Sequence, residues 1–128
     1  EEGGLMMPKG YVDAFRWLRG VSEQDAVVLA HPLPSLWLPA NTAMRVVYGH
    51  PYDTLDSKQR LSDVQAWYDG QNCREIVARY NVRYILTQDD TPFSGEVCLN
   101  ALDLQIPAVV YNDVSIYRVP SRLGRASP

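Results

Sequence analysis

Residues 26–32 are Ala-Val-Val-Leu-Ala-His-Pro. The five uninterrupted apolar residues are typical of a strand that is covered on both faces of a sheet, as strands of parallel sheets are. Pro32 has no backbone N–H to donate, and it biases the residue before it away from helix, so the strand ends at His31. This stretch predicts a central strand of an α/β sheet, with His31 at its carboxyl end.

Helical and strand patterns alternate around this strand. Apolar residues at helical spacing predict three helices. The first covers residues 8–20, the second begins after a cap at Asp53 or Thr54 and ends at residue 68, and the third covers residues 73–80. Further strands are expected over residues 45–48, 82–87, 108–111 and 114–119. Asn72, with Glu75 at the third helical position after it, predicts a capping box. Residues 88–103 mix acidic residues with proline and glycine, which indicates mostly loop.

The order of these elements predicts the fold class. Strands separated by helices favour a parallel sheet, and Asn112-Asp113 between the last two strands suits a hairpin turn. We therefore expect one α/β domain over residues 1–119, in which a small three-layer sheet is parallel in its first part and ends in an antiparallel hairpin. It is Rossmann-like without a nucleotide motif. Residues 120–128 are expected to form a disordered tail.

Composition and missing motifs exclude several functions. The 12 Lys and Arg residues are scattered and the net charge is -3, so nucleic acid is not expected as a partner. No apolar run reaches the roughly 18 residues of a membrane helix. Neither GxGxxG nor GxxxxGK[ST] follows the first strand, and GxSxG is absent, so neither a cofactor nor a hydrolase nucleophile is expected.

Cys73 and Cys98 are the two cysteines of the chain. They lack the CxxC or Cys/His spacing of zinc and redox sites, and neither has an adjacent histidine. Two thiols permit one disulfide without arguing for it, and a pair of ordinary core or surface cysteines is the simpler interpretation.

The carboxyl ends of the first two strands carry the candidate polar site. Ligands of open parallel sheets bind outside such ends, and here His31 follows the first strand while His50 and Asp53 follow the second. A histidine near a carboxylate can act as general base or metal ligand. Two histidines alone make an incomplete metal site unless Asp53 or Asp56 joins them, so no metal ligand is assigned. The structural alternative is that His31 only bonds to nearby backbone.

Aromatic residues near this rim are candidates for stacking on a sugar or a prenyl group, because their rings have apolar faces and polar edges. Trp37 and Tyr52 lie in predicted loops, and Tyr48 ends the second strand. Trp67 lies on a helical face, which favours a place in the core.

Several runs together resemble a known family. They are Ala-Phe-Arg-Trp-Leu-Arg at 14–19, Asp-Ala-Val-Val-Leu-Ala at 25–30, Arg-Val-Val-Tyr-Gly-His-Pro-Tyr-Asp-Thr at 45–54, Tyr-Asn-Val-Arg-Tyr-Ile-Leu at 80–86, and Val-Val-Tyr-Asn-Asp-Val-Ser-Ile-Tyr-Arg-Val at 109–119. The chain resembles the C-terminal soluble region of polytopic membrane glycosyltransferases of the GT-C type, including mannosyltransferase-like and uncharacterised relatives.

The resemblance implies a place and a role. In such families the membrane part carries the catalytic acidic residue and uses a lipid-linked sugar, and no residue of this chain matches that motif. The resemblance therefore implies a non-catalytic accessory ectodomain on the extracytoplasmic face of the cell membrane. Its partners would be the membrane-spanning part of the same polypeptide and a lipid-linked sugar or acceptor. The alternatives are an independent small-ligand or metal-binding domain that uses His31, His50 and Asp53, or a purely structural interaction module.

Overall fold

The computed structural model describes residues 8–21, 23, 25–32, 34, 44–48, 56–121 and 123. Within these residues the elements are α1 (Lys9–Gly20), β1 (Val27–Leu29), β2 (Arg45–Val46), α3 (Ser57–Tyr68), α4 (Cys73–Arg79), β3 (Val82–Gln88), α5 (Glu96–Ala101), β4 (Val109–Tyr111) and β5 (Val114–Arg118). The expected alternation of helices and strands is confirmed.

The strands form one mixed sheet in the order β2-β1-β3-β5-β4. β1 pairs in parallel with both β2 and β3. β5 runs antiparallel to β3 and to β4, and Asn112 makes the turn between β4 and β5 with a φ of 58°. The predicted combination of a parallel first part and an antiparallel C-terminal hairpin is therefore correct.

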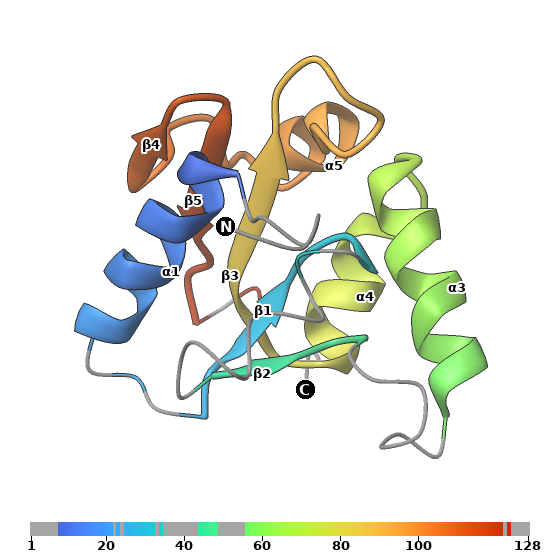
Figure 1. Cartoon of the computed structure of the whole chain (residues 1–128). Helices are drawn as coiled ribbons and strands as arrows, with labels where there is room; N and C mark the ends of the chain where they lie inside the picture. The colour runs from blue at the N-terminus through green and yellow to red at the C-terminus, as the bar shows by residue number, and fades with distance from the viewer. Residues whose placement is uncertain are drawn as a thin grey trace.

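Helices cover both faces of the sheet, which gives three layers (Figure 1). On one face α1 packs over β4 and β5, and the buried side chains between them include Phe15, Leu18 and Ile116. On the other face α3, α4 and α5 enclose a second core that includes Trp67, Ile76 and Ile85. Both cores are apolar, so their burial supplies the main driving force for this arrangement.

The carboxylate of Asp63 in α3 forms hydrogen bonds to the C-terminal end of α4. Asp63 is 5% exposed and accepts hydrogen bonds from Gln59 at 2.8 Å, from Arg79 at 2.7 Å and from the Tyr80 hydroxyl at 2.5 Å. Burial alone would raise the pKa of Asp63, but the hydrogen bonds from Tyr80, Arg79 and Gln59 lower that pKa below its ordinary value. The buried charge is thus fully paired, as burial of a carboxylate requires.

A disulfide links Cys73, the first residue of α4, to Cys98 in α5, with 5.1 Å between their Cα atoms. The sequence left this pairing open. Cys98 is fully buried and belongs to the core under α3 and α4. The bond therefore ties a short helix to the helical layer beside it.

Three local expectations need correction. Residues 96–101 form α5 where mostly loop was predicted, because Cys98 and Leu99 turn inward and bury the helix. Asn72 precedes α4 as expected, but its φ of 55° places it in the left-handed region and its side chain makes no capping hydrogen bond. Beyond Val119 a tail was predicted, yet Leu123 is 1% exposed and packs in the second core.

The contact between α1 and the hairpin leaves no room for a side chain at Gly10. A Cβ atom there would lie 2.8 Å from the Tyr111 carbonyl oxygen and 2.9 Å from a methyl carbon of Val114. Both are closer than real Cβ contacts, and the carbonyl belongs to backbone that cannot turn aside. Gly10 therefore fixes how closely α1 approaches β4 and β5.

Substitution Gly10→Ala should destabilise the domain by about 2 kcal/mol, because the clash outweighs the gain in helix propensity. Gly20→Ala, at the other end of the same helix, is the matched control, since nothing lies within 4 Å of its Cβ position. Urea unfolding monitored by circular dichroism measures both. Equal stability of the two variants would contradict this account of the α1 contact.

Candidate functional site

The sheet has a point at which its strand order reverses. β1 lies between β2 and β3, so the chain moves from β1 to β2 on one side and then crosses to β3 on the other. Open α/β sheets bind ligands beside such points, outside the carboxyl ends of the strands. His31 lies two residues beyond β1, and Gln88 ends β3 at the same edge.

A chain of hydrogen bonds crosses this edge. The Tyr11 hydroxyl donates to Gln88 Oε1 at 2.7 Å, and Gln88 Nε2 donates to Asp113 Oδ2 at 2.9 Å. His31 Nε2 lies 3.3 Å from the Tyr11 oxygen. With the Tyr11 proton given to Gln88, the Nε2–H tautomer of His31 can donate to the Tyr11 oxygen. The chain joins α1, β3 and the β4–β5 turn.

Aromatic rings fill the space beside this chain. The Phe93 ring stacks on His31 with 4.0 Å between centroids, and Tyr68 meets Phe93 edge-on at 5.8 Å. The Tyr68 hydroxyl donates to the Leu86 carbonyl at 2.5 Å and lies 3.3 Å from the Leu29 carbonyl. Phe93 thus covers the face of His31 on which a ligand bound at the carboxyl ends of β1 and β3 could stack.

His31 is a packing residue in this arrangement. Burial lowers its pKa to about 4, so the ring is neutral near pH 7. Within residues 8–121 and 123, as far as they are described, no group of three His, Cys, Asp or Glu side chains could hold a metal ion. Within the described residues, His31 lies within hydrogen-bonding distance of the Tyr11 hydroxyl and stacks on Phe93.

The other predicted site residues are not brought together by the described part of the chain. Tyr48 is half-buried and packs against the core under α3 and α4. Trp37, His50, Tyr52 and Asp53 lie outside the described residues. Trp67, which we expected in the core, is fully buried there.

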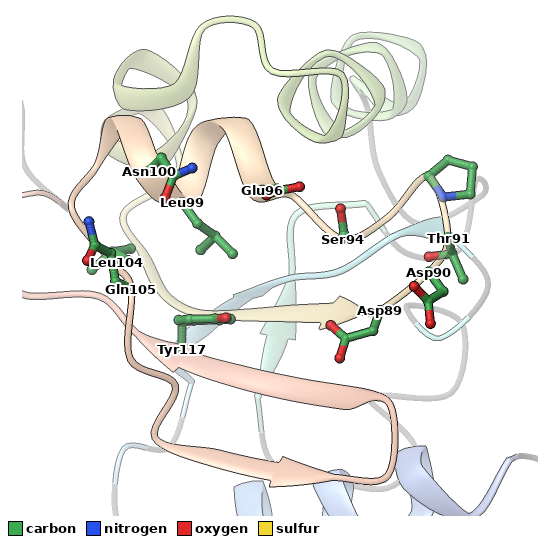
Figure 2. Close-up of a pocket in the computed structure, with 11 residues that line it drawn as sticks. Asp89, Asp90, Thr91, Ser94, Glu96, Leu99, Asn100, Leu104, Gln105 and Tyr117 are labelled. Carbon is green, nitrogen blue, oxygen red and sulfur yellow. The ribbon is translucent and has the colours of Figure 1, made fainter.

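An open pocket of about 750 Å³ lies next to this edge, beyond the end of β3 (Figure 2). Ten of its residues come from one segment, and Tyr117 of β5 is the eleventh. The ten are Asp89, Asp90, Thr91, Pro92, Ser94, Glu96, Leu99, Asn100, Leu104 and Gln105. We call residues 89–105 the pocket segment.

The chemistry of the pocket is polar and acidic. Asp89, Asp90 and Glu96 bring three carboxylates, and none of the described residues that line it is Lys, Arg or His. Burial, and after it the charge of Asp89, raises the pKa of Tyr117, whose hydroxyl end is turned toward that carboxylate (Figure 2). Such a lining can hydrogen-bond to hydroxyl groups or attract a cation, and it repels anions.

Sequence reasoning missed this pocket because it treated residues 88–103 as an undifferentiated loop. The rule that pointed to His31 applies equally here, since Asp89 and Asp90 directly follow a buried strand. No sequence signal identifies Tyr11, which belongs to the apolar stripe of α1, as a partner of His31.

The sequence matches no protein-family model and no curated protein. None of the helices described is both long and apolar enough to cross a membrane.

The buried neutral state of His31 should make the domain less stable in mild acid. The ordinary histidine pKa is 6.5 and the folded value is about 4, so between these values the unfolded chain binds a proton that the folded chain does not. Stability from this group is complete above pH 6.5 and falls as the pH drops toward 4. The loss should be on the order of 2 kcal/mol after allowing for partial exposure of the ring.

Urea unfolding at several pH values from 7 to 4.5 measures this slope. His31→Phe keeps a ring on Phe93 and should flatten the slope relative to the unmodified protein. Tyr11→Phe removes the hydrogen bond but leaves His31 titratable, so it should keep the slope at a lower stability. An unchanged slope in His31→Phe would assign the acid sensitivity to other groups.

Proposed function

We propose that this chain is a non-catalytic, extracytoplasmic accessory domain of a membrane-bound glycosyltransferase-like protein. The observation that carries the proposal is the disulfide between Cys73 and Cys98. Disulfides form and persist in secreted and extracytoplasmic compartments and are rare where cellular thiols are kept reduced. The bond agrees with the side of the membrane that the resemblance to GT-C proteins implies.

The chemistry of the described residues supports the non-catalytic part of the proposal. His31 is neutral and covered by Phe93, and Asp63 is engaged by three hydrogen-bond donors. Neither is arranged as a base or nucleophile beside a substrate cavity. In the proposed protein, catalysis belongs to the membrane-spanning part.

The orientation of α1 supports a role at the membrane side. Tyr11, in the first turn of α1, bonds to Gln88 at the end of β3, and the pocket begins at the next residue, Asp89. The start of α1 and the pocket therefore share one edge of the sheet. If a membrane part precedes α1, the pocket lies on the edge nearest to it, where it would contact the sugar portion of an acceptor or of a lipid-linked sugar.

If the domain is extracytoplasmic, Cys73 and Cys98 should be joined by a disulfide in the native polypeptide. After thiols are blocked in intact cells, trypsin should yield residues 61–74 linked to residues 84–118, because no Lys or Arg lies inside either peptide. Mass spectrometry before and after reduction detects the pair, and membrane fractions should contain it. The same domain expressed in a reducing cytoplasm is the control. Blocked, unlinked cysteines in the native protein would contradict the proposed location.

A second candidate function, an independent small-ligand domain, is favoured by the pocket itself. Its carboxylates and the Asn100 and Gln105 amides offer acceptors and donors to a hydroxyl-rich ligand, and the absence of lining cations disfavours phosphorylated ligands. In either function the ligand expected is an uncharged or amine-bearing saccharide.

Titration of the labelled domain with mannose, glucosamine and glucose 6-phosphate, followed by nuclear magnetic resonance, tests this ligand class. The first two should shift amide signals of the pocket segment, and the phosphate should not. Asn100→Ala should weaken binding by about tenfold, the usual value of a lost polar contact. Gln65→Ala, an exposed amide on α3, should have no effect. Shifts from all three sugars alike, or from none, would count against the pocket.

A further inference from the structure

The pocket depends on a segment with little support of its own. Of the described residues that line the pocket, the pocket segment supplies every one except Tyr117. Its one helix, α5, has six residues, far fewer than an isolated helix needs for stability in water. The order of the pocket must therefore come from contacts that hold the segment against the rest of the domain.

Phe93 anchors the first part of the segment by stacking on His31, but from residue 94 on few side chains make such contacts. α5 packs against α3 and α4 through Cys98 and Leu99, its two buried residues, whereas Val97 in the same helix is 62% exposed. Leu102, just beyond the helix, is also buried. Leu104 N–H donates to Leu99 O within the segment, whereas the hydrogen bond from Gln88 N–H to Phe93 O joins the part of the segment before α5 to β3.

The backbone of the segment bends at three residues with positive φ. Asp90 and Asp103 adopt φ values of 58° and 59°, in a left-handed region that aspartate tolerates better than most residues with a side chain. Gly95 turns the chain into α5 at φ 66°, with its Cβ position 2.7 Å from the Trp67 ring. These bends place α5 against α3 and add no regular backbone pairing with the sheet.

The covalent attachment is at the centre of α5. Cys98 is fully buried, and its sulfur is bonded to Cys73 at the start of α4. The sheet is held independently, because β3 pairs with β1 over residues 82–85 and with β5 over residues 84–88, and Asp89 N–H donates to the Asp113 carbonyl at 2.8 Å. Loss of the disulfide would therefore act on the segment beyond Asp89 and leave the sheet in place.

We infer that the Cys73–Cys98 disulfide is a redox-sensitive clamp on the pocket. A dithiol such as dithiothreitol breaks the S–S bond by two successive thiol exchanges. Cys73 and Cys98 together gain two electrons and two protons and become thiols, and the dithiol becomes a cyclic disulfide. The reduced domain keeps its sheet and releases residues 94–104, so the pocket exists only in the oxidised protein. The inference goes beyond the proposed location, because an exported domain could carry the bond without its pocket depending on it.

Hydrogen exchange measured by mass spectrometry, with and without dithiothreitol, tests the clamp. Amides of residues 96–102 should exchange at least about tenfold faster after reduction, whereas those of 82–88 and 114–118 should change little, as in local opening. The variant Cys73→Ser, Cys98→Ala has no thiols, so dithiothreitol should not alter its exchange. Unchanged exchange at 96–102 would overturn the inference, and so would equal acceleration in the strands, which would make the bond a support of the whole fold.

The accessibility of the Cys98 thiol to a maleimide tests the clamp without relying on hydrogen exchange. In Cys73→Ser the Cys98 thiol is the single one, and a maleimide should label it rapidly if α5 has been released. Slow labelling, at the rate of global unfolding, would show that α5 stays docked without the bond and would refute the clamp. Circular dichroism of the same sample checks that the sheet is intact.

Discussion

The burial of β3 on both faces is the constraint on which the rest of the domain depends. This strand pairs with β1 on one side and with β5 on the other, so it joins the parallel part of the sheet to the hairpin. Successive side chains point to opposite faces, so Tyr84 and Leu86 pack under α1 while Ile85 packs under the helices of the other face. Each helical layer is therefore positioned by the same seven residues.

The two layers differ in how completely they cover the sheet. α1 lies directly over the hairpin, which the Gly10 contact permits. On the opposite face the layer ends at α5, and the pocket lies between α5 and Tyr117 of β5. The polar groups of the pocket thus lie at the end of the helical layer, where the disulfide holds α5 to α4.

The sequence predicted what depends on periodicity and turn chemistry. The run Val27–Leu29, the stripe of α1 and the turn at Asn112 each follow from local patterns, and so the three-layer class was predictable. The helix α5 was not predictable from local patterns, because only Cys98 and Leu99 of its six residues are buried. Their burial comes from contacts with α3 and α4 and from a disulfide to a cysteine 25 residues away. The partners of His31 were equally inaccessible, since Tyr11 and Phe93 meet it only through tertiary contacts. His50 and Asp53 remain predictions.

The contact of α1 with the hairpin has a consequence for folding. Gly10 lies against Tyr111 and Val114, about a hundred positions further along the chain, and β1 pairs with β3 across an interval of more than fifty. Such distant pairings raise the contact order, and high contact order slows folding. During synthesis, α1 can bury its apolar stripe only after the last strands have emerged. Until then Phe15 and Leu18 are exposed, so the first helix of the chain is among the last parts to gain its native packing.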